Sequence, residues 1–319
     1  MRWGVCMVDA NANAGYNERI KKQKSGGRML QDLDFGKLDN AFHEILPQPT
    51  DPVFCFQDGA VLLHREADDT LQLPTYQQVK ILAEKEKWES WNDESVRYLF
   101  NLQGINYFQW MGQAGACRDG AFAYEPVRPL RQLQSKNICF AIMTAWHLYN
   151  WYRNNRFCGR CGSQTAHDHT ERMLLCPQCG NMIFPKISPA VIIAVTDGNR
   201  LLLSKYAGRS YTRYALLAGY TEIGETLEQT VAREVMEEVG LHVKNIRYYK
   251  SQPWGVEGNV LMGFYCDLDG SEEIHLDESE LALAQWFYRD AIPAKDDGIS
   301  LTREMIRVFE EGREPKGKM

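Results

Sequence analysis

The sequence has no long apolar segment and no excess of basic residues. Its apolar runs, such as the one from Ala190 to Val195, are far shorter than the roughly 20 residues that a membrane-spanning helix needs. Lys and Arg number 36 against 42 Asp and Glu, which gives a net charge of -6. Near the start, Asp9 interrupts an apolar stretch that is too short for a signal peptide. We therefore expect a cytoplasmic protein with no membrane partner and no broad basic surface for nucleic acid.

Four of the nine cysteines form two CxxC pairs. Fourteen residues separate the pairs, which is the spacing of a zinc ribbon. Four thiolates leave no open position on zinc, so the ion would stabilise the fold and take no part in chemistry. The alternative is that the CxxC sequences are two unrelated surface pairs or a redox pair. The predicted ligands of one structural Zn²⁺ are Cys158, Cys161, Cys176 and Cys179.

The other cysteines are scattered along the chain. In a chain without a secretion signal they favour a reducing compartment over a disulfide framework. Four of them have apolar or aromatic neighbours in the sequence, so we expect inert core thiols. These four are Cys55, Cys117, Cys139 and Cys266.

An acidic segment, residues 219–241, is predicted to form an amphipathic helix. Leu227, Val231 and Val235 recur every four residues, so one stripe is apolar and can pack on a sheet. Thr226 and Gln229 can form a capping box at its start, and Gly240 suits the left-handed residue just after its end.

The other face of this helix carries crowded carboxylates. Glu234 and Glu238 are four residues apart and share a face, with Glu237 one position away. Crowded carboxylates resist full ionisation unless a cation neutralises them, and their hard oxygens suit Mg²⁺ or Mn²⁺. The alternative is an ordinary solvated helix, although Arg233 is the one basic residue within it. We predict a catalytic divalent-metal site with two or more ions.

The acidic segment resembles the signature of Nudix hydrolases. The pattern G-x5-E-x7-R-E-hydrophobic-x-E-E-x-G-hydrophobic fits at each fixed position from Gly219 to Leu241. The resemblance implies an α/β (α+β) fold, a Nudix α/β/α sandwich with a mixed sheet. It also implies hydrolysis of a diphosphate by water attack at phosphorus. Glu234 and Glu238 would be metal ligands, Glu237 a further ligand or base, and Glu225 would pair with Arg233. The predicted catalytic residues are Glu225, Arg233, Glu234, Glu237 and Glu238.

The 319 residues are enough for two or three domains. We expect strands at 53–56, 60–63, 98–102, 107–110, 190–196, 200–204, 214–218, 259–266 and 285–288, with helices at 138–151 and after Ser300. Asp58-Gly59 predicts a hairpin turn between the first two strands. The predicted division is a flexible arm (1–30), a β-rich N-terminal domain (31–155), a zinc ribbon (156–186) and a Nudix domain (187–319).

This order of domains resembles the NADH pyrophosphatase (NAD diphosphatase) family of Nudix hydrolases from about residue 40 onward. In that family the signature is followed by S-Q-P-W-P-F-P-x-S, and this chain has Ser251-Gln252-Pro253-Trp254 and then departs. Gly255, Val256, Glu257, Gly258 and Asn259 replace the second half, so we expect a more flexible and more acidic loop. Glu257 would fit poorly beside a phosphate.

The family resemblance also implies further site residues. Glu280 would be a third metal-binding glutamate, although its acidic surroundings alone suggest a solvated residue. Tyr220 and Phe184 would sandwich a base, one from each subunit of a homodimer. The predicted substrate-binding residues are Phe184, Tyr220, Glu171, Gln252, Pro253, Trp254, Asn259 and Thr302.

The predicted activity is NAD(H) diphosphatase, which gives AMP and nicotinamide mononucleotide. Removal of NAD caps from RNA 5′ ends is a further activity that the family implies. One alternative is a Nudix hydrolase of other nucleoside diphosphate-X substrates, such as ADP-ribose, and the altered motif after Trp254 favours it. A second alternative is a non-catalytic nucleotide- or nucleic-acid-binding ribbon protein.

Overall fold

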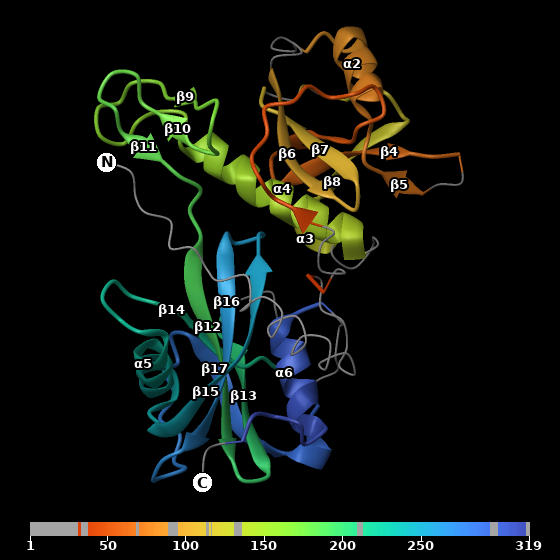
Figure 1. The fold of residues 1–319 in the computed structure, drawn as a ribbon. Coiled ribbons are helices and arrows are strands. Elements are labelled where there is room, and N and C mark those ends of the chain that lie inside the picture. Colours follow the sequence, from red (N-terminus) through yellow and green to blue (C-terminus); the bar gives the residue numbers. More distant parts are fainter. Residues whose placement is uncertain are drawn as a thin grey trace, which may run out of the picture.

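The computed structural model describes residues 31–32, 38–67, 70–88, 95–112, 115, 117–130, 136–208, 213–293 and 299–316. The predicted arm (1–30) and Cys6 lie outside these residues. A β-rich part, a small three-stranded sheet and a large mixed sheet follow one another along the chain, and helix α4 runs from the first to the second (Figure 1).

The N-terminal part contains two four-stranded sheets. One has the order β1-β6-β7-β2, and in the other β4 pairs with β3, β5 and β8. Among the described residues of this part, three helices accompany the sheets. The elements are β1 (Leu38–Asp39), β2 (Val53–Phe54), β3 (Phe56–Gln57), β4 (Ala60–Arg65), β5 (Leu71–Gln72), α2 (Tyr76–Lys85), β6 (Val96–Leu102), β7 (Ile105–Trp110), β8 (Phe122–Pro126), α3 (Val127–Leu130) and α4 (Lys136–Asn154).

Local sequence explains the main turns and helices here. Asp58 and Gly59 have φ of 47° and 83°, which is the left-handed conformation that a tight hairpin between β3 and β4 requires. The predicted hairpin is thus confirmed. Helix α4 also confirms the prediction for 138–151, because Ile142, Ala145 and Trp151 are buried in the core between the helix and the sheets.

The three-stranded sheet contains β9 (Ala166–His167), β10 (Leu174–Leu175) and β11 (Met182–Ile183) in the order β11-β10-β9. The chain then enters the large sheet, whose order is β15-β16-β12-β13-β17, with β14 paired to β12. Its elements are β12 (Ser188–Asp197), β13 (Arg200–Tyr206), β14 (Leu217–Tyr220), α5 (Leu227–Val239), β15 (Val243–Trp254), β16 (Asn259–Leu268), β17 (Leu281–Tyr288) and α6 (Leu301–Glu310).

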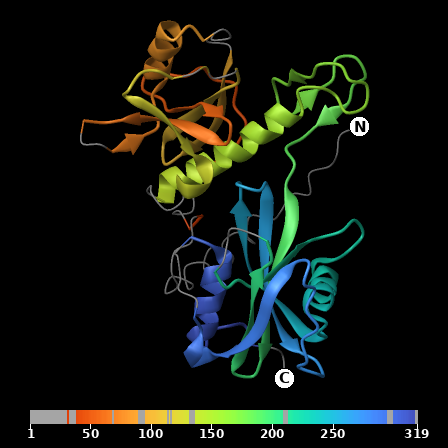
Figure 2. The ribbon, with the colours of Figure 1, turned by 180° about the vertical axis from the view of Figure 1, so that it is seen from behind.

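Helices α5 and α6 cover opposite faces of the large sheet, as seen from both sides (Figures 1 and 2). The apolar side chains of α5 pack with Val191, Phe264 and their neighbours in one core. Those of α6 pack with Leu203, Tyr265 and their neighbours in a second core. Strand β12 is parallel to β16 and antiparallel to β13 and β14. The predicted α/β/α sandwich with a mixed sheet is confirmed.

Strand β15 was not predicted, and two predicted strands are displaced. The segment 214–218 gives β14 at Leu217–Tyr220, and β17 begins at Leu281 instead of residue 285. β15 lies at the edge of the sheet and mixes charged and apolar residues along its length. An edge position tolerates Pro253, which would interrupt a central strand. None of the helices in the described ranges is long and apolar enough to cross a membrane.

Candidate active site

Helix α5 begins and ends where its sequence signals indicate. The Thr226 hydroxyl accepts a hydrogen bond from the Gln229 backbone N–H (3.2 Å), and the Gln229 side chain accepts one from the Thr226 N–H (2.8 Å). This reciprocal pair is a capping box. At the other end Gly240 has a φ of 68°, the left-handed conformation of a helix C-terminus.

The carboxylates of α5 differ in exposure. Glu234 and Glu238 are 9% and 2% exposed, because they lie on the side of the helix that faces the sheet. The Glu237 side chain is 57% exposed. Burial raises the pKa of Glu234, and the negative charges of Glu237 and Glu280 raise it further. The structure therefore brings Glu280, which precedes β17, within electrostatic reach of Glu234.

Arg233 connects most of these acids. Its guanidinium donates to both oxygens of Glu225 (2.6 and 2.9 Å), to Glu234 (2.8 Å) and to Glu237 (2.8 Å). It also donates to the Tyr220 backbone carbonyl (2.9 Å). The bidentate pair with Arg233 lowers the pKa of Glu225 to about 2, so Glu225 stays ionised and holds the loop before α5.

Gly219 lies directly against the Glu234 carboxylate. A Cβ built at Gly219 would be 1.8 Å from the Glu234 Cδ atom and 2.0 Å from Oε1. This close approach is imposed by β14, which pairs with β12 from Leu217 to Tyr220 and leads into the loop before α5. The first glycine of the acidic segment is therefore needed for space, because only glycine leaves room for this carboxylate.

Gly219→Ala is expected to displace the Glu234 carboxylate and to lower kcat for the diphosphate substrate by about a hundredfold, since misplacement by about 1 Å costs this much. Steady-state kinetics at saturating metal would measure it. Gly120→Ala is the matched control, because a Cβ there meets no atom within 4 Å and should leave kcat unchanged. A Gly219→Ala enzyme with the kcat of the parent would contradict this account of the site.

The four predicted zinc ligands come together at one point. Their Sγ atoms all lie within 4.8 Å of one another, with distances of 3.7 Å (Cys158–Cys179) and 3.5 Å (Cys161–Cys176). Each CxxC pair is followed by a glycine with positive φ, 77° at Gly162 and 67° at Gly180. Each glycine N–H donates to the carbonyl of the first cysteine of its pair.

Four converging sulfur ligands fit Zn²⁺ well. The backbone N–H of Arg160 donates to the Cys158 Sγ atom (3.4 Å). Together with hydrogen bonds from the Cys161 N–H and the neighbouring thiols, it lowers the pKa of Cys158 to about 6. A lowered thiol pKa favours the thiolate that binds metal. Among the described residues, this is the one group of three or more His, Cys, Asp or Glu side chains whose ligand atoms are so close together. The carboxylates near α5 form a more open group.

Comparison with known proteins places the chain in a family. Residues 186–309 match the NUDIX domain, and residues 153–184 match the NADH pyrophosphatase zinc ribbon domain. The NAD-capped RNA hydrolase NudC of Vibrio vulnificus is 35% identical over 240 residues, which are 75% of this chain and 86% of that protein. The chain belongs to the NADH pyrophosphatase family of Nudix hydrolases.

Other members of this family are similar over shorter segments. The NAD-capped RNA hydrolase NudC of Erwinia tasmaniensis is 36% identical over 65% of this chain and 80% of that protein. The Pectobacterium atrosepticum protein of the same name is 40% identical over 159 residues, and these cover half of this chain but only 61% of the relative's length. A solved NUDIX hydrolase from Nitrosomonas europaea is 26% identical over 49% of this chain and 91% of its own, with a TM-score of 0.43.

Two exposed aromatic residues occupy the positions that the NADH pyrophosphatase family implies for base stacking. Tyr220 and Phe184 are each 52% exposed, Tyr220 at the end of β14 and Phe184 directly after β11. Asn259, the first residue of β16, is 7% exposed and donates to the Tyr220 hydroxyl (3.0 Å). This bond could not be predicted from the sequence, because 39 residues separate the two positions.

Four other predicted substrate-binding residues lie at the end of β15 and at the start of α6. Gln252 is fully buried; its side chain accepts from the Leu301 N–H (2.7 Å) and donates to the Ile299 carbonyl (2.8 Å). It therefore holds the start of α6 against β15. Thr302 is the second residue of α6 and half-buried, Pro253 is exposed, and Trp254 packs against the N-terminal core.

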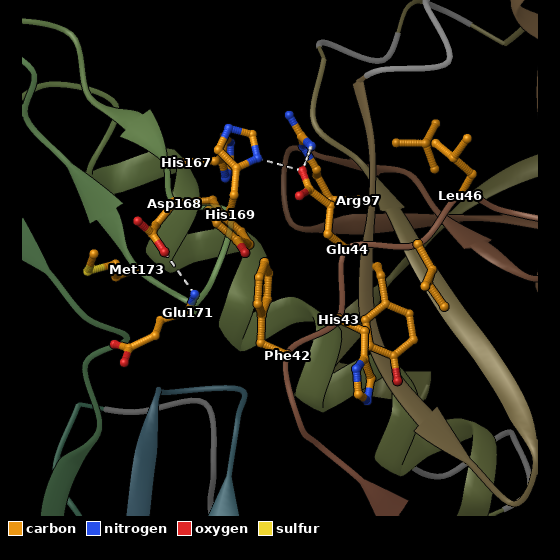
Figure 3. Close-up of a pocket in the computed structure, with 14 residues that line it drawn as sticks. Phe42, His43, Glu44, Leu46, Arg97, His167, Asp168, His169, Glu171 and Met173 are labelled. Atoms are coloured by element: carbon orange, nitrogen blue, oxygen red, sulfur yellow. Dashed lines mark hydrogen bonds and ion pairs between the residues drawn. The ribbon is translucent and has the colours of Figure 1, made fainter.

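Glu171 lies elsewhere, at a cavity of about 350 Å³ between the ribbon and the N-terminal part. Figure 3 shows its carboxylate directed away from the ion pair of Glu44 and His169, which are 2.7 Å apart. Burial lowers the pKa of His167 in this cavity to about 4, so that ring is neutral at pH 7. Neither His167 nor His169 belongs to the group of four converging cysteines.

Two predictions about other residues need correction. Cys55, Cys139 and Cys266 are buried thiols as expected, but Cys117 is only half-buried, because it lies in the loop before β8. The segment 255–258 was expected to form a more flexible and more acidic loop, in which Glu257 would fit poorly beside a phosphate. Instead Gly255 is buried, and the Glu257 carboxylate pairs with Arg128 of the N-terminal part (2.8 Å).

Proposed function

We propose that the protein hydrolyses the pyrophosphate bond of NADH or NAD⁺ and releases AMP and nicotinamide mononucleotide. The observation that carries the proposal is the buried pair of Glu234 and Glu238 beside Arg233, in a chain with the family's zinc ribbon. The family's relatives are described as NAD-capped RNA hydrolases, which supports an NAD-containing substrate.

The residues fit a divalent cation because the donors are hard carboxylate oxygens that repel one another. We propose that Glu234, Glu238 and Glu280 hold Mg²⁺ or Mn²⁺, with Glu237 as a further ligand or base. Such ions neutralise diphosphate oxygens and lower the pKa of bound water. In the described arrangement Arg233 holds Glu234 and Glu237 together, so it supplies positive charge where the acids crowd. Glu225 fixes Arg233 and does not attack phosphorus.

Substrate recognition is proposed to use Tyr220 and the partner's copy of Phe184 on the two faces of a base, which requires a homodimer. Both rings are exposed, which supports the proposal. Glu171, Pro253, Trp254, Asn259 and Thr302 complete the proposed substrate-binding set, with Gln252 acting through the position of α6. A structural Zn²⁺ on the four cysteines would keep the ribbon that carries Phe184 folded.

We further propose that the enzyme removes NAD caps from RNA 5′ ends, as the names of its relatives suggest for those proteins. The net charge of -6 favours small NAD(H) as the main substrate, because strong general affinity for RNA needs basic residues. The proposed location is the cytoplasm. The proposed domain limits are those expected from sequence, 31–155, 156–186 and 187–319.

A substrate panel tests the proposal. With Mg²⁺ or Mn²⁺, kcat/KM for NADH or NAD⁺ is expected to exceed that for ADP-ribose by about tenfold or more, which is about 1.4 kcal/mol of transition-state binding. NADH and NAD⁺ turning over far more slowly than ADP-ribose would contradict it. That result would support the second candidate, a hydrolase of other nucleoside diphosphate-X compounds, which the altered residues after Trp254 favour.

A further inference from the structure

The tip of the β15–β16 hairpin, residues 255–258, packs against helix α4 of the N-terminal part. A Cβ built at Gly255 would be 2.2 Å from the Met143 backbone oxygen, so the hairpin touches the helix backbone. Gly258 has a φ of 73° and lies beside the His147 ring. Trp254 and Val256 pack against the N-terminal core. In Figures 1 and 2 the ends of β15 and β16 point toward α4.

Two polar contacts hold the same tip, and a third joins α4 to the segment before β12. The Glu257 carboxylate pairs with Arg128 of α3 at 2.8 Å. The His147 Nε2 atom lies 2.7 Å from the Lys186 carbonyl, two residues before β12. The Ser188 N–H donates to the Gly258 carbonyl (3.0 Å). The hairpin tip, the start of β12 and α4 therefore form one packed junction.

This junction leads directly to the proposed active site. Asn259 follows the tip without a gap and donates to the Tyr220 hydroxyl (3.0 Å). The Tyr220 carbonyl in turn accepts from Arg233, which holds Glu234 and Glu225. A shift of the tip by about an ångström would move Asn259 and with it the Tyr220 ring.

We propose that the segment from Gly255 to Gly258 is a docking turn through which α4 positions Asn259 and Tyr220 for substrate. Gly255 and Gly258 provide the close approach to the helix, and Glu257 with Arg128 sets the lateral position of the turn. The inference rests on the proposed function, because it takes Tyr220 to contact the substrate. The residues that depart from the family's motif thus serve in docking, and the N-terminal part has a positioning role in catalysis.

Gly255→Ala tests whether the docking turn must contact α4. The added Cβ would clash with the Met143 carbonyl, a backbone atom that cannot rotate away, so the tip must move off α4. KM for NADH is expected to rise about tenfold or more, with kcat within about threefold, because binding geometry is changed and the metal-binding acids are not. Gly120→Ala, where a Cβ meets no atom within 4 Å, is the matched control. A KM within twofold of the parent would overturn the proposal.

Exchanging the charges of Glu257 and Arg128 gives a second test, which does not depend on whether Gly255→Ala folds. Glu257→Arg and Arg128→Glu should each raise KM by about threefold to fivefold, since each places like charges together, and the double variant should restore KM. If KM of the double variant rose by the product of the two single effects, the proposed role of the Glu257–Arg128 pair would be refuted.

Hydrogen exchange can show whether the docking-turn proposal is wrong independently of whether the proposed function is wrong. In Gly255→Ala, amides of β14 and of the start of β16 should exchange faster together with the tip, whichever diphosphate is the substrate. Faster exchange confined to residues 255–258 would overturn the proposal. If the parent enzyme prefers ADP-ribose over NADH, the proposed function fails, and the same KM comparison is then made with ADP-ribose.

Discussion

Glu238→Gln is expected to lower kcat for NADH hydrolysis by about a thousandfold or more at saturating Mg²⁺, which corresponds to about 4 kcal/mol of lost transition-state stabilisation. The glutamine has nearly the same shape as the glutamate, so packing around this 2% exposed side chain is preserved while one metal-binding charge is lost. Steady-state kinetics over a range of Mg²⁺ and Mn²⁺ concentrations would measure the loss.

Stability without metal provides a second readout for the same variant. Removal of one negative charge from the group that contains Glu234 lessens the repulsion there, so thermal stability in EDTA should be unchanged or higher. Stabilisation by added Mn²⁺ should shrink because one ligand is missing. Glu228→Gln is the matched control, since this exposed residue lies in the first turn of the same helix.

The outcome of Glu238→Gln also distinguishes an enzyme from a nucleotide-binding protein. If Glu238→Gln hydrolysed every diphosphate at the rate of the parent, the catalytic assignment of α5 would be wrong. The alternative of a non-catalytic ribbon protein that binds a nucleotide or nucleic acid would then gain support. Loss of turnover with retained folding would exclude that alternative.

Cys176→Ser is expected to abolish zinc binding and to unfold the ribbon. Cys176 is fully buried among the four sulfurs, and the hydroxyl of serine is a poor replacement for a thiolate ligand. Binding of structural zinc supplies on the order of 10 kcal/mol of folding free energy in small zinc domains, far more than three two-residue strands can provide. Metal analysis should fall from about one zinc per chain to none, and amides of β9–β11 should lose protection from exchange.

A matched control for this loss is Cys117→Ser. Cys117 is half-buried in the loop before β8 and is not one of the converging sulfurs, so this variant should keep one zinc per chain. Because the proposed ligands of zinc and of the catalytic ions are separate, any turnover left in Cys176→Ser should keep its dependence on Mg²⁺ or Mn²⁺. A Cys176→Ser protein with full zinc content would contradict the assignment of the four ligands.

Prediction from the sequence succeeded where the decisive interactions are local. The capping box of Thr226 and Gln229, the glycine end of α5 and the Asp58-Gly59 hairpin each depend on residues a few positions apart. It failed at β15, because an edge strand with half-exposed, mixed residues has no clear alternation. The expectation of a loose loop at 255–258 failed because α4, more than a hundred residues earlier, covers it.

The sequence by itself determined the chemistry available to this protein: which acids share one helix face and which four cysteines can hold zinc. Periodicity and ligand spacing involve residues that are close in the sequence, so they can be recognised without knowledge of the fold. The tertiary structure alone decided that Glu280 lies close enough to raise the pKa of Glu234, that a Cβ at Gly219 would meet the Glu234 carboxylate, and that Asn259 bonds Tyr220. These contacts join distant strands and helices, and their partners are set by how the sheet pairs and how the two parts of the chain pack together.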